Sequence, residues 1–173
     1  MPRKARIDAP GALHHIIVRG IEKRNIFLDD TDRYNFLDRL EKVLLETNTT
    51  CLAWALLPNH FHILLRTGTY PLATVMRRLL TGYAMNFNRR HDRVGKLFQN
   101  RYKSILCQEN SYLLELVRYI HLNPLRAAII AEAKYLDTYA FSGHAVVMGN
   151  KKVDWQDHTY VLQLFADKVS IAR

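Results

Sequence analysis

Apolar residues along the chain follow two different periods, and each period predicts a type of secondary structure. Short runs that are continuously apolar or alternate with polar residues predict strands at residues 13–19, 51–57, 60–66 and 102–107. Apolar residues spaced three and four apart predict helices after Asp29, from Pro71 to about His91, and from Ser111 to about Asn123. The order of these elements is β-α-β-β-α-β-α.

Residues at the ends of these segments indicate where the elements begin and stop. Asp29 to Asp32 provide N-cap chemistry and acidic first-turn residues for the first helix. Pro58-Asn59 separates two strands and indicates a hairpin, although it is not a preferred two-residue hairpin turn. Pro124 disfavours helical geometry at Asn123, so the third helix is predicted to end or kink there.

This order of elements predicts an α+β fold, an antiparallel sheet with flanking helices. A ferredoxin-like arrangement is the simplest way to connect it. We predict one domain over residues 1–135 and a C-terminal helical appendage over residues 136–173. The last helical pattern, from about Asp157 to Arg173, ends without a cap or stop signal, so we expect the natural chain to continue.

Charge and composition narrow the range of partners. The net charge of +9 and the pI of about 9.7 favour a polyanion, most commonly nucleic acid. No apolar run reaches the roughly 18 residues of a membrane span, and no signal-peptide core follows the basic start. Cys51 and Cys107 lie in apolar runs and are interpreted as core residues. We therefore expect a cytoplasmic protein with no membrane partner.

Two histidines on one predicted strand form a candidate metal site. Side chains two apart on a strand point to the same side, so His60 and His62 share a face. Imidazoles in a mixed nitrogen and oxygen shell suit several divalent metals, including Mg²⁺ or Mn²⁺. A His-apolar-His triplet has a chance expectation of roughly 0.2 in such a chain, so the motif alone is weak evidence.

A tyrosine and an asparagine on the third predicted helix form a second candidate pair. Tyr119 and Asn123 are four residues apart and therefore share a helix face. Tyrosine serves as a covalent nucleophile, and Asn123 offers a neutral oxygen ligand that can join two imidazoles. The alternative is that Tyr119 lines the core or stacks on a base.

Basic residues gather with aromatic residues in the middle of the chain. Arginine with interleaved aromatics suits single-stranded nucleic acid, whose bases are free to stack. A solvated basic helix face is the alternative. The candidate DNA-binding residues are Arg77, Arg78, Arg89, Arg90, Arg93, Lys96, Arg101 and Lys103.

Five segments together are more specific than any single motif. They resemble the REP-associated tyrosine transposases of the HUH single-tyrosine transposase superfamily, in the family order, over about residues 8 to 130. The segments are Pro10–Gly20, Leu57–Leu65, Phe87–His91, Leu97–Ser104 and Tyr119–Ala127.

The resemblance implies a ferredoxin-like HUH endonuclease fold and a specific chemistry. His60 and His62 are implied to hold Mg²⁺ or Mn²⁺, Tyr119 to be the nucleophile, and Asn123 to be the third ligand. The implied activity is cutting and rejoining of single-stranded or hairpin DNA, such as REP-like palindromes, through a 5′-phosphotyrosine. We expect a monomer or homodimer.

Two other functions remain open from the residues. One is a non-catalytic module that binds single-stranded nucleic acid on its sheet, although the glycine-aromatic strand signature of such modules is absent. The other is a metal-dependent nuclease that activates water without a covalent step.

Overall fold

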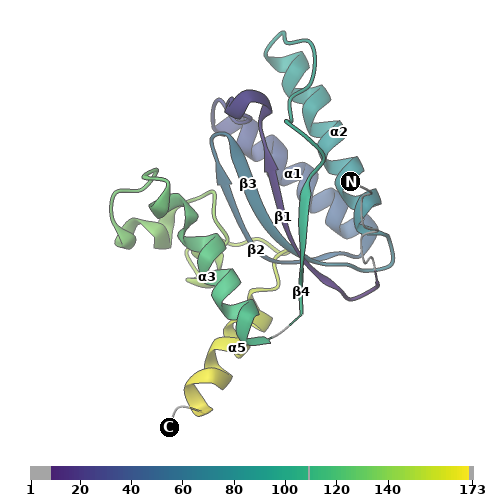
Figure 1. The fold of residues 1–173 in the computed structure, drawn as a ribbon. Helices are drawn as coiled ribbons and strands as arrows, with labels where there is room; N and C mark the ends of the chain where they lie inside the picture. Colours follow the sequence, from purple (N-terminus) through teal and green to yellow (C-terminus); the bar gives the residue numbers. More distant parts are fainter. Residues whose placement is uncertain (1–8, 109, 172–173) are drawn as a thin grey trace.

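A four-stranded antiparallel sheet forms the centre of the protein in a computed structural model, which describes residues 9–108 and 110–171 (Figure 1). The strand order is β2-β3-β1-β4, with β4 at one edge. This arrangement confirms the predicted α+β fold with a ferredoxin-like antiparallel sheet. The strands are β1 (Leu13–Arg19), β2 (Thr50–Leu57), β3 (His60–Arg66) and β4 (Lys103–Cys107).

Helices lie on both faces of this sheet, α1 and α2 behind it and α3 with α5 in front of it as drawn in Figure 1. Three short helical segments complete the described part of the chain. The longer helices are α1 (Asp30–Thr47), α2 (Leu72–Arg90), α3 (Asn110–Arg126) and α5 (His158–Ile171), and the short ones are η1 (Ile21–Lys23), η2 (Ala133–Thr138) and α4 (His144–Val147).

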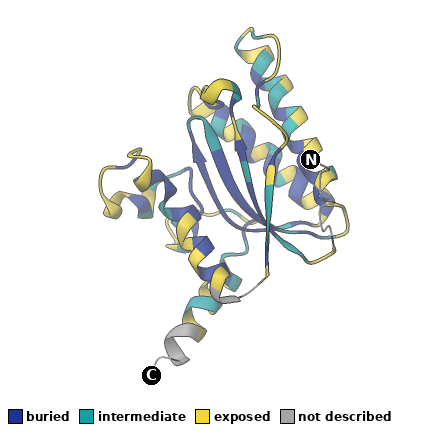
Figure 2. Ribbon diagram, viewed as in Figure 1, coloured by how far each residue is buried: buried dark blue, intermediate teal, exposed yellow. Residues whose placement is uncertain are grey.

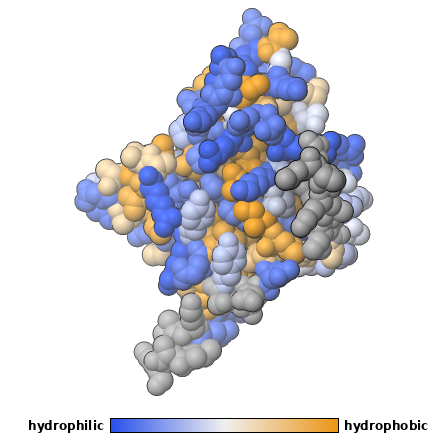
Figure 3. Space-filling view, viewed as in Figure 1, coloured by the Kyte–Doolittle hydropathy of each residue, from blue (hydrophilic) through white to orange (hydrophobic). Residues whose placement is uncertain are grey.

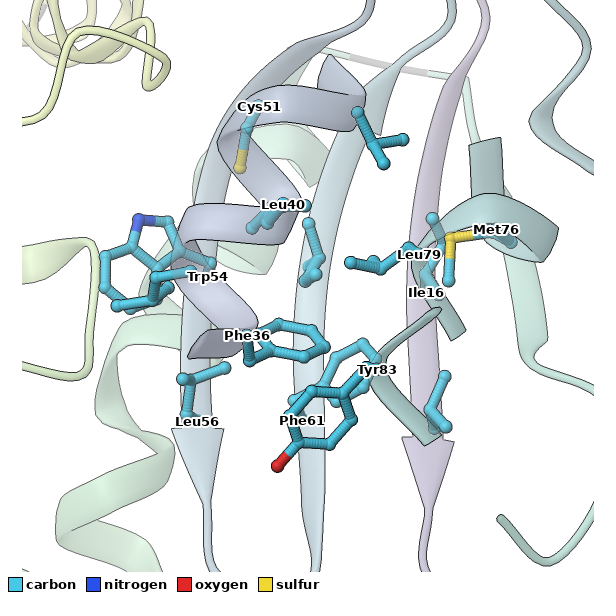
Figure 4. Packing of buried hydrophobic residues seen from close by; sticks show 14 of the residues in the cluster. Ile16, Phe36, Leu40, Cys51, Trp54, Leu56, Phe61, Met76, Leu79 and Tyr83 are labelled. Carbon is cyan, nitrogen blue, oxygen red and sulfur yellow. The ribbon is translucent and has the colours of Figure 1, made fainter. Parts of the chain in front are cut away.

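The alternation of side chains along the strands produces two separate cores. On β3, Phe61 and Ile63 point towards α1 and α2, where they join the larger core shown in Figure 4. Leu64 points to the other face and packs with Val117 and Ile120 of α3 in the smaller core. Strands β1, β2 and β3 are buried along most of their length, while β4 and the outer helix faces are more exposed (Figure 2). His60 and His62 therefore belong to the face that α3 covers.

The end of α3 differs from the sequence-based prediction. The helix contains Ser111 and continues through Pro124 to Arg126, so a helix end at Asn123, one of the two predicted outcomes, is wrong. Proline forfeits one backbone hydrogen bond, and only the last two helical residues follow it, so the last turn persists. Asn123 consequently keeps its helical relationship to Tyr119.

The C-terminal segment runs beside the free edge of β2. The amide of Leu56 donates to the Phe141 carbonyl at 2.9 Å, and the amide of Gly143 donates to the Trp54 carbonyl at 2.8 Å. Phe141 and Trp155 are buried in the larger core. This pairing protects a sheet edge from unwanted association. The division into two units at residue 135 stays a prediction, and residues 172–173 of the predicted last helix lie outside the described part.

Both cysteines are buried and unbonded to each other, as their apolar surroundings predicted. In the ranges that the structure describes, we find no helix with the length and apolar character needed to cross a bilayer.

Candidate functional site

His60 and His62 stand side by side on the face of β3 that lies beneath α3. Their ring centroids are 5.2 Å apart and their planes are nearly perpendicular. His62 is only 2% exposed, whereas His60 is half-buried at the start of the strand. The strand alternation thus brings the two imidazoles together, as the sequence predicted.

Each of the two imidazoles is held at its Nδ1 atom by a neighbouring side chain. His60 Nδ1 lies 2.7 Å from Oδ1 of Asn59. His62 Nδ1 lies 2.9 Å from Nε2 of His15, which comes from β1. The Nε2 atom is therefore the nitrogen that each ring can offer to a ligand.

Burial favours the uncharged form of both imidazoles. It lowers the pKa of His62 to about 3, and the nearby His15, His60 and Arg19 add to that effect. Burial also lowers the pKa of His60, with Arg19 as a second cause. A neutral imidazole keeps the lone pair that metal binding requires.

Tyr119 lies on α3 directly against this pair. Its ring centroid is 5.7 Å from that of His62 and 6.0 Å from that of His15, both in edge-to-face contacts. The guanidinium of Arg126 lies over the Tyr119 ring, 5.3 Å from its centroid. Because the tyrosine is still 38% exposed, it can meet a substrate from solvent while it touches the histidines.

Asn123 lies one helical turn beyond Tyr119 and is 8% exposed. Its Nδ2 donates a hydrogen bond to the backbone carbonyl of Tyr119 at 2.8 Å. This bond fixes the carboxamide and leaves its Oδ1 atom as an acceptor.

These donors fit a divalent metal, although they make an unusual set. Nowhere in the described residues do three or more His, Cys, Asp or Glu side chains form a group that could hold a metal ion. Imidazole nitrogens and an amide oxygen form a neutral, mixed set that can ligate a divalent metal ion alongside water and phosphate oxygens. Substrate phosphate would then supply the negative charge that the protein side chains lack.

Two cations flank the site on the same sheet face. Arg19 lies opposite His60 in the pairing of β1 with β3, and Lys103 of β4 lies opposite Ile17, itself opposite His62. Paired residues of antiparallel strands point to the same side. Sequence reasoning included Lys103 and missed Arg19, because strand register decides the position of the arginine.

Two of the other predicted DNA-binding residues form ion pairs with acidic side chains. Arg78 contacts Glu46 of α1 at 3.6 Å. Arg90 is ion-paired with Asp29 at 2.7 Å and with Asp32 at 2.6 Å. Their contribution to DNA binding stays a prediction. The remaining members lie on α2 and in the segment from α2 to β4: Arg77, Arg89, Arg93, Lys96 and Arg101.

An open part of the sheet adjoins the site. The α3 helix packs mainly over β2, which leaves Ile17 of β1 and Ile105 of β4 only partly covered. Figure 3 shows apolar surface in the middle of this face, between α3 and β4, with hydrophilic groups around it. Apolar surface rimmed by cations is suited to stacked bases and their phosphates.

Comparison with protein families identifies the chain. A family model described as "Transposase IS200 like" matches residues 10–123. The protein belongs to the IS200-like transposase family. The match spans both histidines, Tyr119 and Asn123, and the resemblance to tyrosine transposases is confirmed. Transposases of this kind cut DNA and generally use a divalent metal ion.

A solved structure resembles this chain in fold. A REP-associated tyrosine transposase bound to a REP hairpin has a TM-score of 0.68 and 20% identity, covering 90% of this chain and 91% of its own. A structure described as a transposase from Deinococcus radiodurans has a TM-score of 0.48 and 17% identity, over 69% and 95% of the two chains. A comparison with curated proteins found no match.

Proposed function

We propose that this transposase cuts and rejoins single-stranded hairpin DNA by transesterification, with Tyr119 as the nucleophile. His60, His62 and Asn123 would hold Mg²⁺ or Mn²⁺. The observation that carries the proposal is the contact of the Tyr119 ring with His62, 5.7 Å between centroids. This contact places the proposed nucleophile next to a proposed metal ligand, at a position that a substrate can reach from solvent.

The residues divide the chemistry among them. Tyr119 Oη loses its proton and forms a bond to phosphorus, while the bond from phosphorus to the 3′ oxygen breaks and that oxygen takes up a proton. The products are a 5′-phosphotyrosine and a free 3′ hydroxyl, and another 3′ hydroxyl reverses the step to reseal a strand. When bound, the metal supplies Lewis-acid stabilisation of the charge that develops on the phosphate oxygens.

Fixed charge and shape support DNA as the substrate. Arg19 and Lys103 project from the sheet face beside the histidines and favour the phosphates on either side of the scissile bond. The partly covered Ile17 and Ile105 offer an apolar surface for unpaired bases. Since exchange of one phosphodiester for another conserves bond energy, no nucleotide cofactor is needed.

We propose REP-like palindromes as the target class. The structurally similar transposase was solved with a REP hairpin, and this chain shares its fold at 20% identity. The net charge of +9 suits the dense phosphates of a folded hairpin. We further propose that the protein acts in the cytoplasm as a monomer or a homodimer.

Trapping a covalent adduct tests this function. Labelled single-stranded hairpin DNA is incubated with protein and Mn²⁺, resolved under denaturing conditions, and any adduct is mapped by peptide digestion. We expect an adduct at Tyr119 that Tyr119→Phe abolishes, together with cleavage. Phenylalanine keeps the ring contacts to His15 and His62, so the fold should be preserved.

The two other functions give different results in the same experiment. Cleavage without an adduct, unchanged in Tyr119→Phe, would indicate a nuclease that activates water. Binding without cleavage at any metal concentration would indicate a non-catalytic binder. An adduct on a different tyrosine would remove Tyr119 from the proposed role.

A further inference from the structure

His62 is contacted by His15 of the neighbouring strand β1, and His15 has no direct part in the proposed reaction. His15 of β1 lies opposite Leu64, which is the next residue after His62 on the same face of β3. Its Nε2 atom is 2.9 Å from Nδ1 of His62, and the two rings are stacked with centroids 5.2 Å apart. Both side chains are buried, so the bond is shielded from water.

His60 has a corresponding partner in the turn before β3. The Oδ1 atom of Asn59 lies 2.7 Å from Nδ1 of His60. The Nδ2 atom of Asn59 donates to the carbonyl of Lys23 at 3.3 Å, and the Asn59 backbone carbonyl accepts from the amide of Gly20 at 2.9 Å. The carboxamide is therefore held in the orientation that aims its oxygen at the histidine.

An imidazole that binds a metal through Nε2 carries its proton on Nδ1. That proton needs an acceptor, and the acceptor fixes both the tautomer and the direction of the lone pair. Nε2 of His15 and Oδ1 of Asn59 occupy the two acceptor positions. We infer that His15 and Asn59 are positioning residues, which preset His62 and His60 to present their Nε2 lone pairs to one metal ion. The inference rests on the proposed metal site.

His14 provides a matched control that separates a positioning role of His15 from a purely structural one. His14 precedes His15 on β1, is equally buried at 3% against 4% exposed, and contacts Oγ of Ser104 at 3.0 Å. It points to the opposite face of the sheet, away from His62. Replacement of either histidine disturbs the sheet, but only His15 contacts His62, a proposed metal ligand.

The test measures Mn²⁺ binding to the full chain without DNA, by the electron paramagnetic resonance signal of free Mn²⁺. Nitrogen couplings in the bound ion report imidazole coordination independently of activity. We expect His15→Leu to weaken Mn²⁺ binding by about 10- to 100-fold, the usual effect of removing an outer-shell partner. His15→Gln, which places an amide oxygen near the lost Nε2, should recover much of the affinity. His14→Leu should bind like the wild type.

Substitutions of Asn59 provide a second, independent test of the inference. Asn59→Ala should weaken Mn²⁺ binding to a similar extent, whereas Asn59→Asp keeps an acceptor oxygen and should bind at least as well as the wild type. Thermal unfolding of every variant identifies any that fail to fold, and the Asn59 pair still decides the matter if His15→Leu is one of them.

Three results would overturn the inference. They are wild-type affinity in both His15→Leu and Asn59→Ala, equal losses in His15→Leu and His14→Leu, or no recovery in either conservative variant. If wild-type protein binds Mn²⁺ without nitrogen couplings, the proposed metal site itself has failed. If the nitrogen couplings are present but the variants bind Mn²⁺ like the wild type, the metal site stands and only the positioning role has failed.

Discussion

Tyr119 of α3 and His62 of β3 meet edge to face, with ring centroids 5.7 Å apart and ring planes at 85°. The contact exists because α3 packs its apolar side onto the sheet, where Val117 and Ile120 share the smaller core with Leu64. The same packing sets the distance of the proposed nucleophile, Tyr119, from the proposed metal ligand His62. The geometry of the proposed site therefore depends on how α3 packs on the sheet.

Replacing either histidine should stop DNA cleavage and spare DNA binding. His60→Ala and His62→Ala each remove one of two imidazole donors, so metal held at the site should be lost while Arg19 and Lys103 remain to bind phosphate. Cleavage of labelled hairpin DNA is measured at limiting Mn²⁺, and binding is measured by fluorescence anisotropy. Normal cleavage by both variants at limiting metal would contradict the assignment.

Replacing Arg19 or Lys103 should weaken DNA binding and leave metal binding intact. Arg19→Ala and Lys103→Ala should each weaken binding to single-stranded hairpin DNA and reduce the slope of log K against log salt by about one unit or less. Metal binding should persist in both. The measurement is a salt titration of anisotropy for each variant.

Arg77→Ala provides the comparison for that titration. Arg77 is exposed on α2, which packs on the opposite face of the sheet, and sequence reasoning included it among the DNA-binding residues. A loss as large as that of Arg19→Ala would extend the binding surface around to α2. Unchanged binding in both Arg19→Ala and Lys103→Ala would show that DNA does not cross this face.

Periodicity was sufficient to predict the members of the site that lie on one element. His60 and His62 share a strand face, and Tyr119 and Asn123 share a helix face, so each pair follows from local geometry alone. The proximity of the two pairs was implied only by the family resemblance. It arises from the packing of α3 on the sheet, which local patterns do not encode.

Contacts between elements explain what the sequence could not show. His15 and Arg19 reach the site through the register of β1 against β3, and no spacing within β1 reveals that register. Sequence reasoning placed Arg90 among DNA-binding residues because it lies in a basic run. Its ion pairs with Asp29 and Asp32 depend on where α2 ends relative to the start of α1.

Arg90→Ala should destabilise the fold more than Arg89→Ala does. Arg90 joins the end of α2 to the start of α1 through Asp29 and the buried Asp32, whereas Arg89 forms no ion pair with the described residues. Thermal unfolding at neutral pH should give a clearly lower Tm for Arg90→Ala and a near wild-type Tm for Arg89→Ala. Equal values for the two variants would show that the ion pairs add no stability.

The pH dependence of that difference gives a further check. The Arg90 guanidinium holds the pKa of Asp29 down at about 2, from an ordinary value of 3.8. A lowered carboxyl pKa contributes stability above the unfolded value, and the contribution is lost as pH falls to the folded value. The stability gap between wild type and Arg90→Ala should therefore narrow between about pH 4 and pH 2.

Acid should destabilise the metal-free protein before its carboxylates titrate. Burial lowers the pKa of His15 to about 4 and those of His62 and His121 to about 3, all from 6.5. The unfolded chain binds these protons near pH 6.5 and the folded chain does not. Stability is therefore complete above that pH and falls as the pH drops through the window down to about 3.

His121 allows this effect to be measured apart from the metal-binding residues. It lies on the buried side of α3, where its ring contacts that of His144, 5.7 Å between centroids. His121→Leu places an apolar side chain at this buried position and removes one titrating group. Urea unfolding with a chelator, between pH 7 and pH 4.5, should show a shallower decline than in the wild type, by up to about 1.4 kcal/mol per pH unit. Parallel curves for the two proteins would mean that His121 takes up its proton equally in the folded and unfolded states.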